Sequence, residues 1–201
     1  LTSINRVVAG ICKLLADKVY SKPIETEIRL WWSERLHIEF TDKHWSKLMA
    51  KHDRALRESR LKLSYFKILH RWHWTPQCLN HTGLMPGTKC WRCNHQGCNI
   101  VHVLWECTAL TNYWTPVWQT IQMVLGVSRP LTPQTAILHD DKGYTTINYH
   151  KCKWFAIALS IAKMGILRLW RPSTSPTHQT WIEDMHTIAT YERVIYKIND
   201  Q

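Results

Sequence analysis

The residues best suited to chemistry in this chain are four cysteines and two histidines gathered in the segment 90–107. Cys90 and Cys93 form a C-x2-C turn, which lets two thiolates converge on one ion. His102 and Cys107 follow, with four residues between them. The pattern C-x2-C-x8-H-x4-C supplies three sulfurs and one imidazole, which is a closed tetrahedral set for Zn²⁺. Because no ligand position is left for water, the spacing predicts a structural zinc site rather than a hydrolytic one.

Cys98 and His95 lie inside the same segment and are competing ligands. Cys98 has suitable chemistry, but four other residues already fill the shell, so we interpret it as a neighbour that could substitute. The geometry adds a constraint, because positions five apart on a continuous α-helix point about 140° away from each other. His102 and Cys107 can therefore share an ion only if the helical turn between them breaks or Cys107 lies past the helix end. The alternative is a set of reduced cysteines packed in a core.

The use of cysteine also bears on where the chain works. An odd total of seven, clustered in one segment, suits a reducing compartment and a metal better than an oxidised secreted scaffold. The start of the chain has no signal-peptide pattern, and its first residue, Leu1, suggests a piece of something longer. The most apolar run, 154–170, carries Lys163 and Arg168, so we expect a buried helix and no membrane partner.

Positive charge is concentrated in two segments of the chain. The formal net charge is +11, from 26 basic and 15 acidic residues. Residues 43–73 hold nine basic and two acidic residues, and residues 150–171 hold five and none. One basic stripe alone would be interpreted as a solvated face. Two such segments without balancing acids favour an anionic partner such as nucleic acid.

Hydrophobic periodicity predicts a mainly α-helical chain. One face of an expected helix repeats cations at i, i+4, i+8 and i+11: Lys43, Lys47, Lys51 and Arg54. The other expected helices cover residues 3–20, 61–72, 75–83, 115–125 and 150–171, with a last one from 177.

The predicted organisation is a helical domain with an irregular zinc-knuckle insertion. It comprises a basic helical region at 1–88, a CCHC zinc knuckle at 89–108 and a helical C-terminal region at 109–201. The segment 127–148, with its prolines, is interpreted as a loop or weak hairpin. If the chain forms two units, we expect the boundary inside that segment.

Common catalytic motifs are absent from the sequence. It has no G-x-x-x-x-G-K-[ST], G-x-G-x-x-G, G-x-S-x-G or H-E-x-x-H. The pair Asp140-Asp141 is similar to carboxylate pairs that bind two Mg²⁺ ions, which would make the chain an enzyme. Such a site needs a further carboxylate, however, and Asp-Asp-Lys-Gly is more simply a turn. We predict no catalytic residue in this chain.

Several short sequence motifs of unusual composition, in the same order along the chain, resemble those of one known family. That family is the second open-reading-frame protein of vertebrate long interspersed nuclear elements (LINE retrotransposons), in its C-terminal region. The motifs and residues that carry the resemblance are Lys67-Ile68-Leu69-His70-Arg71-Trp72, Thr75-Pro76, Cys90-Trp91-Arg92-Cys93, His102 and Trp105-Glu106-Cys107. Further matches that support it are Trp45, Ile161-Ala162-Lys163, Ile166-Leu167, Trp170, Trp181 and Tyr191-Glu192. The likeness covers roughly residues 30–200.

The resemblance implies both a ligand set and a partner. It makes Cys90, Cys93, His102 and Cys107 the motif ligands, although the added Cys98 and His95 keep that set open. It implies binding of RNA or single-stranded DNA beside an upstream reverse-transcriptase domain, in a ribonucleoprotein of the cytoplasm and nucleus. The resembled parent is an RNA-directed DNA polymerase and endonuclease, whereas this chain alone is not expected to polymerise.

We therefore predict that the chain positions RNA or target DNA for target-primed reverse transcription. Cations that meet phosphates and tryptophans that stack on bases are expected to form the interface. These residues are Lys43, Lys47, Lys51, Arg54, Lys62, Lys67, Arg71, Trp72, Trp74, Trp91, Arg92, Lys151, Lys153 and Arg168. The rival prediction is a protein-interaction module that docks on the polymerase body through an exposed apolar patch.

Overall fold

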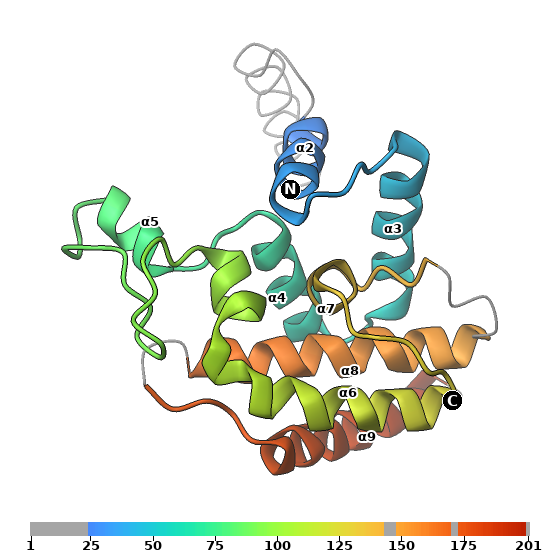
Figure 1. Cartoon of the computed structure of the whole chain (residues 1–201). Coiled ribbons are helices and arrows are strands. Elements are labelled where there is room, and N and C mark those ends of the chain that lie inside the picture. The colour runs from blue at the N-terminus through green and yellow to red at the C-terminus, as the bar shows by residue number, and fades with distance from the viewer. Residues whose placement is uncertain (1–23, 143–147, 170–172, 200–201) are drawn as a thin grey trace, which may run out of the picture. The chain divides into compact units, whose positions relative to one another are not determined.

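The computed structural model describes residues 24–142, 148–169 and 173–199 (Figure 1), without the side chains of residues 24, 51–53 and 195–199. It is mainly α-helical, as predicted. The predicted helix over 3–20 lies outside the described residues, as do Trp170 and the side chain of Lys51. In chain order the elements are α2 (Ile24–Leu36), α3 (Asp42–Ala55), α4 (Ser59–Leu69), α5 (Pro76–His81), the π-helical turn η1 (His102–Glu106), the 3-10 turn η2 (Thr108–Leu110), α6 (Thr111–Leu125), α7 (Pro133–Leu138), α8 (Tyr149–Arg168) and α9 (His178–Asn199).

The chain divides into two compact units, residues 1–45 and 46–201, and α3 crosses the division. The first unit buries Trp32, Phe40 and Trp45, and Arg29 donates a hydrogen bond to the carbonyl of Phe40. The predicted limits after residues 88 and 108 both lie inside the second unit, and so does the segment 127–148.

The segment 127–148 differs from its prediction because it contains α7. Thr132 caps this helix, accepting a hydrogen bond from the backbone N–H of Thr135, and Pro133 occupies its first turn. Ala136, Ile137 and Leu138 are fully buried. A short helix with a buried face therefore fills the place expected to be a loop or weak hairpin.

Helix α8 is the central element of the second unit. Helices α6 and α9 lie along it, and α4 and α7 pack against it as well (Figure 1). Its middle turns, from Phe155 to Lys163, are buried on every side, as expected for a helix covered by several neighbours. In the part of the chain that the structure describes, no helix has both the length and the apolar character to cross a membrane.

Several helix ends carry capping residues that are typical of such positions. Thr75 caps α5 with Pro76 in the first turn, and Gly126 ends α6 with a φ of 71°. The hydroxyl of Thr41 accepts a hydrogen bond from the N–H of His44 at the start of α3. Helix α6 is different, since it begins at Thr111 and carries Pro116 inside. Its buried early residues outweigh the lost backbone hydrogen bond.

Candidate metal centre and aromatic pocket

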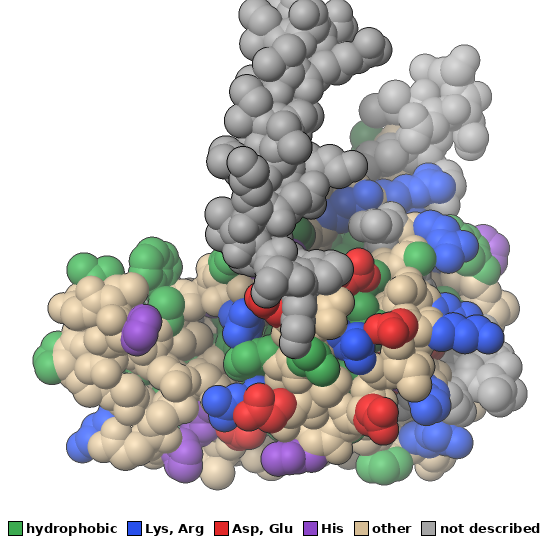
Figure 2. All heavy atoms as spheres, turned by 90° about the horizontal axis from the view of Figure 1, so that it is seen from above, with side chains coloured by type: hydrophobic (Ala, Val, Ile, Leu, Met, Phe, Trp, Pro, Cys, Tyr) green, Lys and Arg blue, Asp and Glu red, His purple; other side chains and the backbone are tan. Residues whose placement is uncertain are grey.

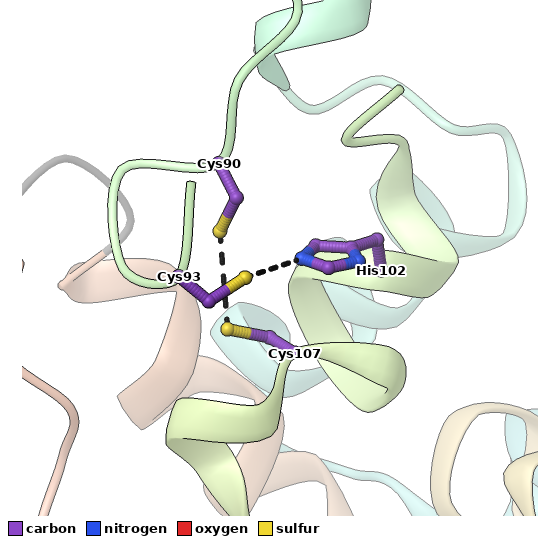
Figure 3. Close-up of side chains that lie close together, drawn as sticks. All are labelled: Cys90, Cys93, His102 and Cys107. Atoms are coloured by element: carbon purple, nitrogen blue, oxygen red, sulfur yellow. Dashed lines mark hydrogen bonds between the residues drawn. The ribbon is translucent and has the colours of Figure 1, made fainter. Parts of the chain in front are cut away.

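Four side chains of the cysteine-rich segment point toward one another (Figure 3). One ligand atom from each of Cys90, Cys93, His102 and Cys107 lies within 4.8 Å of the others. The sulfurs of Cys90 and Cys107 are 3.8 Å apart, and the sulfur of Cys93 is 3.2 Å from Nε2 of His102. The four predicted ligands therefore form one cluster that could hold a metal ion.

The C-x2-C turn is shaped by backbone hydrogen bonds around Cys90. The N–H of Cys90 donates to the carbonyl of His95 at 2.8 Å, and the N–H of Asn94 donates to the carbonyl of Cys90 at 3.0 Å. Asn94 has a φ of 59°, a conformation that asparagine tolerates better than most residues. The chain thus reverses after Cys93 and returns toward the cluster.

The π-helical turn η1 brings the last two ligands together. The N–H of Cys107 donates to the carbonyl of His102 at 3.1 Å, which is the i→i+5 bond of a π-helix. Closing that bond returns residue 107 over residue 102 after about one turn, and Cys107 leaves the helix in an extended conformation. The prediction that the turn breaks its α-helical geometry, or that Cys107 lies past the helix end, is confirmed on both counts.

Burial and neighbouring groups shift the pKa values of three of the four residues in the cluster, and not all in the direction that favours metal binding. Burial raises the pKa of Cys90, but backbone N–H groups of Cys93 and Arg92 point at its sulfur and bring its pKa below the ordinary value. Burial lowers the pKa of His102, and its neighbours His95 and Arg92 lower it further. A lowered pKa favours the neutral imidazole that binds metals, and its Nδ1 lies 3.8 Å from the carboxylate of Glu106. Burial also raises the pKa of Cys107 to about 12, so an ion would have to displace its proton.

The two competing ligands lie beside the cluster rather than in it. Among the described residues, the set of converging ligand atoms contains neither His95 nor Cys98. The ring of His95 stacks on that of His102, with centroids 4.8 Å apart and planes 7° apart. Cys98 is fully buried, and burial raises the pKa of its thiol far above the ordinary value. Cys98 is thus a neighbour of the cluster, as interpreted from the sequence.

Arg92 has a different environment from the one predicted. Its guanidinium donates hydrogen bonds to the carbonyls of Ile166 at 2.8 Å, Leu169 at 2.7 Å and Val103 at 3.4 Å. Two of these carbonyls end α8, where carbonyl groups lack helical partners and the helix dipole is negative. Arg92 thus ties the C-x2-C turn to η1 and α8, and these bonds direct its guanidinium inward rather than toward a phosphate.

Four of the predicted interface residues line one pocket in the second unit: Lys67, Trp72, Trp74 and Arg168. The pocket has a volume of about 350 Å³ and lies among the end of α4, the segment 70–75, η1 and the end of α8. Sequence reasoning missed its other lining residues, among them His73 and Val103. No local signal could have found them, since their shared pocket depends on tertiary packing.

The remaining predicted cations fall into two groups. Exposed side chains are those of Lys43, Lys47, Arg54, Lys62 and Arg71. Other cations are engaged, because Lys151 donates to the carbonyl of Leu125 at 2.8 Å and Lys153 pairs with Glu192. Trp91 is half-buried. Figure 2 shows one face of the molecule, on which Lys and Arg side chains lie at several places with acidic side chains among them.

The pair Asp140-Asp141 takes part in a turn. Asp140 is buried, and its Oδ1 accepts a hydrogen bond from the backbone N–H of Lys142 at 3.0 Å. Its backbone carbonyl accepts a further bond from the hydroxyl of Thr135. This is the local bonding expected of an aspartate that shapes a turn.

No family model matches this chain. The resemblance to the LINE proteins therefore remains a prediction from the sequence.

Proposed function

We propose that this chain is a zinc-stabilised, nucleic-acid-binding C-terminal domain of a LINE-type reverse transcriptase, which positions RNA or target DNA for target-primed reverse transcription. The observation that carries the proposal is the four-ligand cluster of Cys90, Cys93, His102 and Cys107 within a strongly basic helical chain. The sequence resemblance supports the family, and an intracellular ribonucleoprotein is the setting that it implies.

Zinc is the metal that this ligand set fits best. Three sulfurs and one imidazole are soft and borderline donors, which favour Zn²⁺ over Mg²⁺ or Ca²⁺. With Zn–S bonds of about 2.3 Å, two sulfurs of a tetrahedral site lie about 3.8 Å apart. The sulfurs of Cys90 and Cys107 have that separation, 3.8 Å. When bound, the ion would cross-link the C-x2-C turn to η1 and leave no open position for a substrate.

The charge of the chain supports a polyanionic partner. The net charge is +11, and α3 and α4 carry exposed cations such as Lys47, Lys62 and Lys67. Concentrated positive charge attracts phosphates and releases their counterions on binding. The affinity for single strands should therefore fall with salt, with a log–log slope of about −0.7 for each phosphate contacted.

A titration of labelled single-stranded RNA and DNA across a salt series tests this function. We expect wild-type protein to bind with a steep salt dependence, and Cys93→Ser to bind more weakly because the metal-held turn is lost. Cys78→Ser is the matched control, since Cys78 is half-buried in α5 and outside the cluster. A nearly flat salt dependence, or no binding, would overturn the proposed function.

A second candidate is the protein-interaction module, and one observation favours it. Leu63 and Phe66 on α4 are 53% and 43% exposed, so that helix presents apolar side chains as well as cations. Exposed apolar groups of this kind can mark a docking face. This candidate predicts that the purified chain binds the polymerase body while free RNA and single-stranded DNA give no titratable signal.

A further inference from the structure

Two tryptophans on the segment between α4 and α5 face solvent. Trp72 is 65% exposed and Trp74 is 54% exposed, which leaves large apolar surfaces in water. Neither is needed to fill the core of the second unit. Exposed aromatic planes of this size are used elsewhere in proteins to stack on ligands with flat rings.

Backbone bonding at the end of α4 holds Trp72 in place. The N–H of Trp72 donates to the carbonyl of Lys67 at 2.7 Å, and the N–H of Arg71 donates to the carbonyl of Ile68 at 2.9 Å. With Arg71 at a φ of 59°, this is a Schellman ending. The ring of Trp72 also packs edge-on against Phe66, with centroids 5.3 Å apart. The aromatic surface is therefore positioned before any ligand arrives, which lowers the entropic cost of binding.

The pocket beside these rings combines an apolar wall with two cations. Met164 and Leu167 of α8 supply apolar lining, while Lys67 and Arg168 supply positive charge. Its volume of about 350 Å³ far exceeds that of one water, about 30 Å³, and suits a ring system. Arg168 pairs with Asp184 yet remains 58% exposed, so its guanidinium can still reach a ligand.

The charges select among flat ligands. Two cations beside the pocket disfavour a cationic guest such as a methylated amine. They favour an aromatic ring that is attached to phosphates on both sides, which is the chemistry of a nucleotide within a single strand. In a duplex, each base is already stacked and paired and cannot enter without unstacking.

We propose that this pocket takes one unstacked base of single-stranded RNA or DNA, which stacks on Trp72 or Trp74 while Lys67 and Arg168 contact the flanking phosphates. This inference rests on the proposed nucleic-acid function and adds the place and the mode of contact.

The candidate metal centre supports one wall of the pocket. Val103 lines the pocket and directly follows the ligand His102 in η1. Arg92, inside the C-x2-C turn, bonds the carbonyls of Val103 and of Ile166 and Leu169 at the end of α8. The hydrogen bonds of Arg92 thus connect the turns that carry the candidate ligands to the end of α8, which lines the pocket.

The test is a fluorescence titration of the whole chain with an oligouridine of about 12 nucleotides. Trp72→Ala or Trp74→Ala, whichever removes the stacked ring, should weaken binding about 5- to 150-fold, the range expected for one stacked base. Neither variant should change the salt slope, because no phosphate contact is lost. The phenylalanine variant at that same position keeps a stacking ring and should recover most of the affinity. Wild-type tryptophan emission should be quenched on binding, and the quenching should be smaller in the alanine variants.

Tyr149→Ala is the matched control, because Tyr149 is an aromatic residue, 59% exposed, in the first turn of the same α8 that ends at the pocket. If wild-type protein binds with a steep salt slope and the tryptophan variants bind equally well, the pocket inference is wrong and the proposed function stands. If wild-type protein does not bind the oligonucleotide at any salt concentration, both are wrong. Circular dichroism of every variant separates lost contact from lost fold.

Discussion

Arg92 makes three hydrogen bonds to backbone carbonyls, one in η1 and two at the end of α8. A planar guanidinium presents five N–H donors in a rigid fork, whereas a lysine ammonium is a compact point charge with three donors. We expect Arg92→Lys to lower the free energy of unfolding by about 1.5–3 kcal/mol, the usual range for hydrogen bonds to a charged group. Urea unfolding measures this change.

The same variant separates two roles for Arg92. If it positions the pocket, Arg92→Lys weakens oligonucleotide binding with an unchanged salt slope. If it meets a phosphate, as predicted from the sequence, the unfolding free energy stays constant while Arg92→Gln reduces the log–log slope by about 0.7. Lys62→Gln, at an exposed residue of α4, supplies the comparison for a simple surface charge.

Residue types alone predicted which four residues form the cluster, but not the environment of Arg92. A C-x2-C…H…C pattern by itself indicates a metal site, because few other roles need cysteine and histidine at that spacing. A basic residue carries no such information. Whether Arg92 faces solvent or bonds the end of α8 depends on residues more than 70 positions away in the sequence.

Helix α8 is the element on which the packing of the second unit depends, and it carries a lysine in its core. Lys163 is fully buried, contacts the carbonyl of Ile137 and Nε2 of His139, and lies 5.3 Å from the ring centroid of Tyr65. Burial holds the pKa of Lys163 well below its ordinary value of 10.5. The unfolded chain therefore binds a proton that the folded chain does not bind, over the pH range between the two values.

Lys163 should consequently contribute a rise of the free energy of unfolding with pH over the range below 10.5, of up to about 1.4 kcal/mol per pH unit. Lys163→Met should remove that contribution, while Lys62→Met, at an exposed position, should keep it. Urea unfolding at a series of pH values measures the slope. The same slope in wild type and Lys163→Met would contradict a neutral buried amine.

The elements were predictable where local signals were strong. Threonine before proline indicates the start of α5, and Gly126 the end of α6. The same signal, Thr132 before Pro133, starts α7, but the prolines of this segment favoured a loop or weak hairpin. Burial of Ala136 to Leu138 stabilises this helix, and burial of that kind is set by tertiary packing rather than by the local sequence.

At the scale of the whole molecule, the candidate metal centre and the proposed pocket are connected through the fold. Arg92 and Val103 join the ligand turns to the end of α8, and Trp72 and Trp74 lie across the same pocket. Charge composition is the observation from which an anionic partner is predicted. The pocket, in contrast, joins residues from about 67 to 168, a juxtaposition that hydrophobic periodicity cannot indicate.

Native mass spectrometry of the purified chain tests the central claim most directly, because it counts the bound metal and identifies it by mass. We predict one zinc per wild-type chain, also in Cys98→Ser and Cys78→Ser, and its loss in Cys93→Ser and Cys107→Ser. A wild-type chain that binds no zinc when supplied with it, or that keeps one zinc after the loss of Cys93, would contradict the account.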